Sequence, residues 1–374
     1  MRSRLAIGLA LLVASLCRCA NNKATTAGHS DASLTTGVDS GRHDAHSEAA
    51  EKGGNDAGDA GDASDASLDA DAVVDAAPFP CGTRTGMRGL TSRSVVVDGK
   101  TRTYLIYLPT TLDPTAPMPF VFVFHGFLMS GRLMYDITQY TAIADADGVG
   151  VAFPDGDGGP GTVTAPWNDE NPGQLVCGEG QYVVGTANDF GFIDAMKADV
   201  SKDQCLDTQH VFTTGFSMGG YFAEHVACYR DDMRAVAPHS GGTIGDLSVC
   251  TSGHVPMIIF HGTKDSVIDE ACDDPTSTKL EQGFPASGTL WAAKNGCSKT
   301  YTTLPIANDA GGGTGQCYLY DDCPADGQVE VCTFNGMDHC WAGGSTAGDA
   351  GVSACPTYPS ATQLEWQFFK QYAW

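Results

Sequence analysis

From residue 94 onward, short apolar runs typical of β-strands alternate with stretches in which apolar residues recur at helical spacing. The predicted strands are Ser94–Val97, Thr101–Leu108, Phe120–Phe124, Val149–Pro154, His210–Thr214, Ala235–Pro238, Val255–Phe260 and Gln328–Phe334. Helical spacing occurs in Tyr140–Gly148, Asn188–Val200, Tyr221–Tyr229 and Ala361–Tyr372. This alternation predicts an α/β fold with a mostly parallel sheet and helices on both faces.

Two features predict where strands lie within that sheet. Asp98-Gly99-Lys100 separates two β-rich runs, and an Asp-Gly turn in this setting predicts a hairpin, which we expect at an antiparallel edge. Phe120–Phe124 is continuously apolar, as expected for a central strand covered on both faces.

A serine motif connects the strand His210–Thr214 to the helix Tyr221–Tyr229, and it reads Gly215-Phe216-Ser217-Met218-Gly219-Gly220. A serine at the apex of a strand-turn-helix connection has a strained backbone that lifts its hydroxyl clear of the sheet, while flanking glycines let strand and helix approach each other. We predict that Ser217 is a nucleophile and that the N–H of Met218, at the positive end of the helix, is an oxyanion donor. The alternative is a glycine-rich connection with an incidental serine.

The order of residues along the chain supplies an acid and a base. In α/β-hydrolases the serine is followed by an acid and then by a histidine. Asp265 comes just after the strand Val255–Phe260, and His339 lies in the loop behind the strand Gln328–Phe334. We predict that Asp265 orients His339, which takes the proton of Ser217.

Other residues of these types are alternatives. Asp269 is the nearest competitor for the acid. The rival bases are His225 on the nucleophile helix, His239 after the strand Ala235–Pro238, and His261, which precedes Asp265. We interpret each of these histidines as structural.

Loops at the same strand ends carry candidate binding groups. His125-Gly126-Phe127 leaves the end of a buried strand, where the N–H of Phe127 is the predicted second oxyanion donor; an ordinary strand-to-loop turn is the alternative. Trp167, on the long loop Asp155–Asp169, either stacks on a sugar or aryl group or plugs the loop. His125, Trp167 and Trp341 are the predicted substrate contacts.

The first 80 residues differ in composition from the rest. In residues 1–20, Arg2 and Arg4 precede the apolar run Leu5–Leu16, which has the shape of a secretory signal and is too short to span a bilayer. A lipid anchor on Cys17 or Cys19 is an alternative, although neither cysteine follows the small residue that a lipoprotein signal has at that place. Residues 21–80 contain 12 acidic and three basic side chains among Ala, Asp, Gly and Ser, which predicts a disordered linker. Residues 81–374 form the predicted catalytic domain.

Charge and cysteine content limit the binding partners and the cellular compartment that we expect for this protein. The part after residue 80 has 33 acidic and 15 basic residues, and this net charge of −18 disfavours nucleic acid and anionic membranes. Twelve cysteines follow the signal region, which in an exported protein predicts up to six disulfides. We expect no metal site, because no Cys-x-x-Cys pair or Cys/His cluster is present.

The expected disulfides are only partly specified by the sequence. Cys205 is predicted to pair with Cys228. One locally linked group is expected to comprise Cys297, Cys317, Cys323 and Cys332.

Taken together, these motifs resemble the extracellular polyhydroxybutyrate depolymerase and feruloyl esterase family of α/β-hydrolases. The likeness runs from about Thr101 to the C-terminus. It rests on His125-Gly126, Pro154-Asp155-Gly156 with Trp167-Asn168, Asn188-Asp189-Phe190-Gly191-Phe192, the serine motif, His261-Gly262-Thr263-Lys264-Asp265, and His339-Cys340-Trp341-Ala342-Gly343-Gly344.

This chain departs from the family pattern at a few positions. The family usually has Pro where Ala342 stands and often Asn where Met218 stands. In tannase-like relatives a cysteine precedes the serine and is bonded to one after the histidine. Here Phe216 precedes Ser217, so the resemblance implies another partner for Cys340.

The signal segment and the triad together predict an exported serine esterase that needs no cofactor, and we expect it to be a monomer. The resemblance implies feruloyl or acetyl esters of plant polysaccharide as its substrates. A polyhydroxyalkanoate depolymerase is the alternative within the same chemistry. The alternatives from other classes are a non-catalytic surface protein of the same fold that binds glycan, and a serine peptidase.

Overall fold

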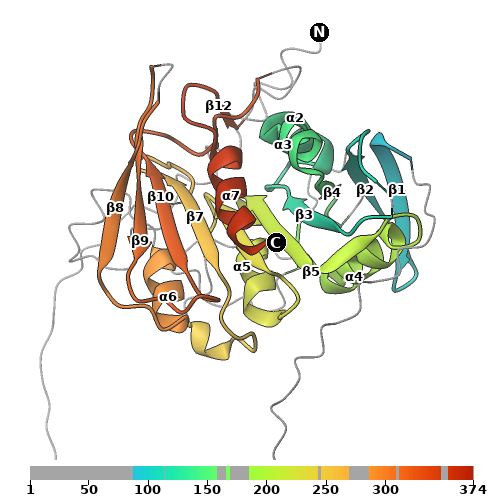
Figure 1. The fold of residues 1–374 in the computed structure, drawn as a ribbon, viewed down its shortest axis with the longest axis horizontal. Coiled ribbons are helices and arrows are strands. Elements are labelled where there is room, and N and C mark those ends of the chain that lie inside the picture. The colour runs from blue at the N-terminus through green and yellow to red at the C-terminus, as the bar shows by residue number, and fades with distance from the viewer. Residues whose placement is uncertain are drawn as a thin grey trace, which may run out of the picture. The chain divides into compact units, whose positions relative to one another are not determined.

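The computed structural model describes residues 87–113, 115–157, 166–168, 185–242, 246–268, 286–308, 311–346 and 353–373. Among these residues, ten strands form one sheet with the order β1-β2-β4-β3-β5-β6-β7-β10-β9-β8 (Figure 1). The predicted signal, the linker and their boundaries at residues 20 and 80 lie outside the described residues and stay predictions.

The strands of this sheet are β1 Gly89–Val97, β2 Lys100–Leu108, β3 Met118–Phe124, β4 Gly150–Pro154, β5 Leu206–Phe216, β6 Ala235–His239, β7 Met257–Gly262, β8 Tyr301–Ile306, β9 Gly315–Tyr320 and β10 Val329–Phe334. A separate two-stranded pair consists of β11 Trp341–Ala342 and β12 Ala354–Cys355. The helices are α2 Gly131–Thr138, α3 Tyr140–Asp147, α4 Asp189–Val200, α5 Met218–Tyr229, α6 Ala286–Lys294 and α7 Ala361–Phe369, with 3-10 turns η1 Leu247–Val249 and η5 Lys370–Tyr372. All eight predicted strands and all four predicted helices are present.

The centre of the sheet is parallel and both of its edges are antiparallel. Strands β4, β3, β5, β6, β7 and β10 pair in parallel. The predicted β1–β2 hairpin joins β4 in antiparallel fashion, which confirms that expectation. A second antiparallel hairpin, β8–β9, extends the sheet beyond β10 and was not predicted.

Helices cover both faces of the sheet, as predicted, and β3 shows how (Figure 1). Its residues Phe120, Phe122 and Phe124 pack in a core with side chains of α4, α5 and α6. The intervening Val121 and Val123 pack in a second core with side chains of α2, α3 and α7. Because successive side chains of a strand point to opposite faces, a strand buried on both sides needs this unbroken apolar run.

Disulfides link described residues at four places: Cys228–Cys250, Cys297–Cys323, Cys317–Cys332 and Cys340–Cys355. The predicted local group is confirmed, whereas the predicted Cys205–Cys228 pair is wrong. The main-chain oxygen of Cys228, near the end of α5, accepts the N–H groups of Thr251 and Ser252 at 2.9 and 3.0 Å. This contact brings Cys250 to Cys228, while Cys205 precedes β5 and is disulfide-bonded elsewhere.

No helix in the described part of the chain combines the length and apolar character needed to cross a membrane.

Candidate active site

The predicted nucleophile Ser217 stands at a sharp turn between β5 and α5, with a φ of 55° and a ψ of −119°. The turn is tight because glycines flank it. A Cβ on Gly215 would lie 2.2 Å from the oxygen of Gly219, and a Cβ on Gly219 would lie 2.2 Å from the oxygen of Phe124. The predicted close approach of strand and helix is therefore confirmed. The N–H of Ser217 donates to the oxygen of His239 at 2.9 Å, which ties the turn to β6.

The predicted acid and base are in contact. Nδ1 of His339 lies 2.8 Å from Oδ2 of Asp265, whose side chain is 1 % exposed. Oδ1 of Asp265 accepts the N–H groups of Val267 and Ile268, each at 2.9 Å. Burial by itself raises the pKa of Asp265. The hydrogen bond with His339, the charges of His339 and His261, and the N–H of Ile268 lower it by more than burial raises it, so the net pKa is below the usual value. Asp265 is therefore an ionised partner for His339 at neutral pH.

Neighbouring parallel strands bring these two residues together. Gly262 ends β7 opposite Phe334, which ends β10. A Cβ on Gly262 would lie 2.3 Å from the oxygen of Met337, so glycine lets the two following loops pack directly on each other. Lys264 N–H donates to that same oxygen at 3.0 Å. The carboxyl ends of β7 and β10 thus place Asp265 and His339 within hydrogen-bonding distance.

Both predicted oxyanion donors flank the serine. A Cβ on Gly126 would lie 3.1 Å from Cβ of Ser217, so the loop after β3 runs against the nucleophile turn just before Phe127. Met218 is the first residue of α5, where helix N–H groups have no acceptor within the helix. Among the described residues, the N–H groups of Phe127 and Met218 donate to no acceptor. Their role as oxyanion donors stays a prediction.

The three predicted substrate contacts are buried. His125 and Trp167 are 0 % exposed, and Trp341 is 1 % exposed. The main-chain N–H of Gly156 donates to Nε2 of His125 at 2.9 Å, and Trp167 Nε1 donates to the oxygen of His125 at 2.8 Å. Trp341 Nε1 donates to Oγ1 of Thr362 at 2.9 Å. The structure corrects the prediction: these side chains hold loops together and offer no surface to a substrate, which favours the alternative that Trp167 plugs its loop.

A buried polar cluster beneath the turn was not predicted. Nε2 of His239 lies 2.5 Å from Oε2 of Glu365 on α7, and Glu365 also accepts hydrogen bonds from Tyr140 and, at 3.0 Å, from Oγ1 of Thr214. Burial raises the pKa of Glu365 well above its usual value and lowers that of His239 well below its own. Both groups are therefore neutral. One feature of the sequence could have indicated this cluster: Glu365 lies on the same apolar face of α7 as Phe368 and Phe369.

The ring of His239 connects this cluster to the loops above it. It stacks on Trp341 with ring centroids 3.6 Å apart and on Phe260 at 4.4 Å. Trp341 comes two residues after His339, and Phe260 lies on β7 before Asp265. His239 thus packs as a structural residue: its oxygen accepts the N–H of Ser217, and its ring contacts strand residues close to Asp265 and His339.

The other rivals do not replace Asp265 and His339. His225 is buried among Phe190, Phe222 and Tyr229. Nδ1 of His261 lies 4.0 Å from Oδ2 of Asp265, farther than that of His339. The competing acid Asp269 lies outside the described residues.

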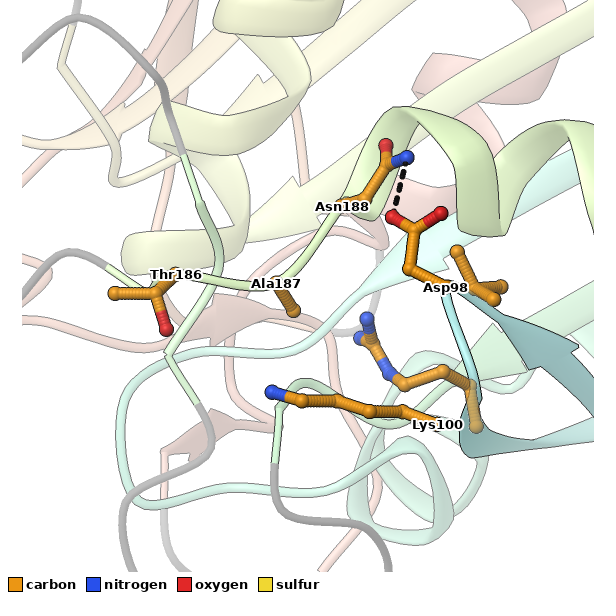
Figure 2. A pocket seen from close by; sticks show the side chains of 7 residues that line it. Asp98, Lys100, Thr186, Ala187 and Asn188 are labelled. Carbon is orange, nitrogen blue, oxygen red and sulfur yellow. Dashed lines mark hydrogen bonds between the residues drawn. The ribbon is translucent and has the colours of Figure 1, made fainter.

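A separate pocket of about 80 Å³ lies where the tip of the β1–β2 hairpin meets the start of α4 (Figure 2). Figure 2 shows Asp98 and Lys100 on the hairpin side and Thr186 to Asn188 on the other, with Asn188 donating to Asp98 at 2.9 Å. Arg102 also lines the pocket but is paired with buried Asp189 at 2.6 Å. The residues that line this pocket include none of the predicted triad.

One group of described residues has the spacing of metal ligands: Cys317, Glu330 and Cys332. The two cysteines are bonded to each other across β9 and β10, so neither supplies a thiolate.

Comparisons with known proteins find similar chains among hydrolases and esterases. A model of the dienelactone hydrolase family matches residues 187–289, which include Ser217 and Asp265. Feruloyl esterase D from Neurospora crassa is 28 % identical over 319 residues, covering 80 % of this chain and 93 % of that protein. Feruloyl esterase B from Piromyces equi is 26 % identical over 284 residues, covering 73 % of this chain and 45 % of that protein. This chain thus spans less than half of the second relative.

A solved structure shows the same fold. Acetyl xylan esterase from Aspergillus awamori superimposes with a TM-score of 0.51 at 16 % identity, covering 75 % of this chain and 99 % of that one. The parallel sheet with helices on both faces and the serine turn after β5 are the α/β-hydrolase arrangement. The chain is a carboxylic ester hydrolase of the α/β-hydrolase fold and resembles the feruloyl esterases.

Proposed function

We propose that this protein is an exported serine esterase that hydrolyses feruloyl or acetyl esters on plant polysaccharide, with Ser217, His339 and Asp265 as its catalytic triad. The observation that carries the proposal is the 2.8 Å hydrogen bond between His339 and buried Asp265, on loops beside the strained turn at Ser217. A histidine hydrogen-bonded to a buried carboxylate, next to a serine at a strand-to-helix turn, is the arrangement that generates a serine nucleophile.

The first half-reaction forms an acyl-enzyme. Nδ1 of His339 faces Asp265, which fixes the tautomer and leaves Nε2 to take the proton as Oγ of Ser217 attacks the ester carbonyl. The carbonyl oxygen becomes negative in the tetrahedral intermediate and accepts the N–H groups of Phe127 and Met218. Collapse of the intermediate breaks the ester bond, and His339 returns the proton to the leaving alcohol.

The second half-reaction releases the acid. His339 takes a proton from water, and the resulting hydroxide equivalent attacks the acyl carbonyl in the same oxyanion site. When the bond to Oγ breaks, the proton on His339 passes back to Ser217. Throughout, the negative charge of Asp265 stabilises the imidazolium form of His339.

The relatives support the substrate class, and the cysteines support export. Both relatives described above are named feruloyl esterases, and another, from Neocallimastix patriciarum, is named a bifunctional acetylxylan esterase/xylanase. Disulfides such as Cys228–Cys250 form in oxidising compartments, which fits the predicted secretory signal. The acidic composition also suits a neutral polymer better than an anionic one.

Ester hydrolysis by the wild type and by Ser217→Ala tests the proposal. We expect release of p-nitrophenol from a short-chain ester, of ferulate from methyl ferulate or of acetate from acetylated xylan, and a loss on the order of 10⁴-fold or more in Ser217→Ala. Ser248→Ala, on the turn η1, is the control and should match the wild type. Equal rates for the wild type and Ser217→Ala would exclude Ser217 as the nucleophile.

Covalent labelling separates an esterase from a glycan-binding protein of the same fold. A fluorophosphonate probe should label the wild type at Ser217 and leave Ser217→Ala unlabelled. A wild type that binds xylan but neither hydrolyses these esters nor takes the label would be a binding protein. Turnover of poly-hydroxybutyrate with no turnover of methyl ferulate or acetylated xylan would shift the substrate to polyesters.

A further inference from the structure

We propose that Asp338 is a positioning residue that clamps the Asp265 loop to the His339 loop and thereby holds the catalytic hydrogen bond in register. This inference rests on the proposed esterase function. Oδ1 of Asp338 accepts three hydrogen bonds, each of 2.8 Å, from the N–H of Ser266, from Oγ of Ser266 and from the N–H of His339. One oxygen therefore joins the residue after the acid to the base itself.

The clamp is a carboxylate rather than a carboxylic acid. Burial by itself raises the pKa of Asp338. The hydrogen bonds from Ser266 and from the N–H of His339 lower it by more, so the net pKa lies below the usual value. An ionised acceptor makes stronger hydrogen bonds to N–H and O–H donors than a neutral one. Three such bonds converge on one atom of Asp338.

The position of Ser266 matters because it lies inside the turn that holds Asp265. Oδ1 of Asp265 accepts the N–H groups of Val267 and Ile268, so the chain from 265 to 268 wraps around the carboxylate. A shift of Ser266 therefore moves the group that orients His339. Further hydrogen bonds join the two loops before these residues, for example from the N–H of Lys264 to the oxygen of Met337 at 3.0 Å and from the N–H of Gly336 to Oγ1 of Thr263 at 2.8 Å.

Because the clamp lies at the surface, its effect on catalysis can be measured apart from any effect on stability. Asp338 and Ser266 are both exposed, and hydrogen bonds at the surface contribute little to the free energy of unfolding. Catalysis is far more sensitive to geometry, because a misplacement of about 1 Å costs up to about 10²-fold in rate. Removing the clamp should therefore lower turnover while leaving the fold intact.

The test compares Asp338→Ala with Asp338→Asn on an ester that the wild type hydrolyses. Asp338→Ala should lower kcat by roughly 10- to 100-fold with little change in KM, because Asp338 acts through His339 and Asp265. Asp338→Asn should restore most of the rate, since its amide oxygen accepts the same three hydrogen bonds. The rate of labelling by a fluorophosphonate should follow kcat in each variant.

Two further variants sharpen the result. Ser266→Ala removes one of the three donors and should cost less than Asp338→Ala, and it should add little in the Asp338→Ala background. Asp246→Ala is the matched control, because Asp246 is an exposed carboxylate that caps η1 by accepting the N–H of Ser248 at 2.9 Å. It should keep the wild-type rate. Thermal unfolding of all variants should stay within a few degrees of the wild type.

The outcomes distinguish the clamp from the esterase function itself. A wild type without esterase activity or labelling would overturn both. An active wild type with an equally active Asp338→Ala would overturn the clamp alone. A raised KM with unchanged kcat would make Asp338 a substrate contact, and an Asp338→Asn as slow as Asp338→Ala would show that charge rather than positioning is required. Either result would also overturn the clamp.

Discussion

The aromatic ring of Phe216 packs against the imidazole of His339, with ring centroids 4.8 Å apart and ring planes tilted by 36°. Phe216 is 1 % exposed and directly precedes Ser217, so the nucleophile turn and the base are in side-chain contact. Tannase-like relatives have a disulfide at the corresponding place. Here Cys340 is bonded to Cys355 instead, as the resemblance implied when it required another partner for Cys340. A ring contact therefore stands where those relatives have a covalent bond.

Replacing this ring tests whether the contact supports turnover. Phe216→Leu keeps a similar apolar volume, so the free energy of unfolding should fall by less than about 1.5 kcal/mol. The imidazole, however, loses the flat surface that limits its orientation, and we expect kcat to fall by roughly 10-fold or more. The measurement is kcat together with denaturant unfolding.

Phe212→Leu is the matched control for that variant. Phe212 lies on the same strand, is 0 % exposed, and stacks on Phe369 of α7 at 4.7 Å. Its replacement should cost similar stability and leave kcat unchanged. If both variants keep the wild-type kcat, the ring of Phe216 serves packing alone.

The elements that could be predicted are those whose burial leaves a distinct pattern of apolar residues in the sequence. β3 is buried at every position, and its continuous apolar run was sufficient to place it in the sheet. β8 is exposed at four of its six positions, so apolar and polar residues do not alternate along it, and Pro305 weakens the strand signal of its β-prone Tyr and Thr residues. Its pairing with β9 is possible at an edge of the sheet, where a missing N–H donor is tolerated.

The same distinction holds within the site. Chain order and strand ends were enough to select Asp265 and His339, which the structure brings together. Whether an aromatic side chain faces a ligand or the core is decided by neighbours far away in sequence, such as Thr362 for Trp341. That contact could not be predicted. Neither could the clamp at Asp338, because it depends on the register between two loops 72 residues apart.

Asp265→Asn should lower kcat by about 10⁴-fold while the protein stays folded. An amide presents a donor as well as an acceptor to Nδ1 of His339, so it favours the tautomer whose Nε2 carries a proton and cannot take one from Ser217. The measurement is kcat on p-nitrophenyl acetate, with circular dichroism as the check on folding. A variant that retains more than a tenth of the wild-type kcat would show that another carboxylate is the acid.

Glu365→Gln should stabilise the protein increasingly as the pH rises. The pKa of Glu365 is raised by burial, so the folded state must keep a proton that the unfolded state releases above about pH 4.5. The stability that depends on this proton is present below that pH and is lost as the pH rises, by up to about 1.4 kcal/mol per unit. Glutamine mimics the protonated acid, with an oxygen for Tyr140 and an N–H for His239.

Urea unfolding at pH 5 and at pH 8 measures this effect. The gap in free energy of unfolding between Glu365→Gln and the wild type should be wider at pH 8. Glu365→Ala is the contrasting variant and should be less stable than both at either pH, because it removes the hydrogen-bond partner of buried Tyr140 and His239. A gap that does not widen with pH would mean that Glu365 is ionised in the folded protein.

His225 should produce the opposite pH dependence. Burial lowers its pKa from 6.5 to about 4, and neither ring nitrogen has a hydrogen-bond partner among the described residues. The unfolded chain binds a proton as the pH falls through 6.5, whereas the folded chain does so only near 4. The stability contributed by neutral His225 is therefore present above pH 6.5 and is lost as the pH falls from 6.5 toward 4.

His225→Phe removes this loss and keeps a ring between Phe190, 5.3 Å away, and Tyr229, 4.8 Å away. The gain in free energy of unfolding over the wild type should be larger at pH 5 than at pH 8. Some acid sensitivity should remain, because burial also lowers the pKa of His239. Because the effects of His225→Phe and Glu365→Gln change in opposite directions with pH, each serves as the control for the other. A gain from His225→Phe that is the same at both pH values would show that His225 is already charged, or free of the burial penalty, in the folded state.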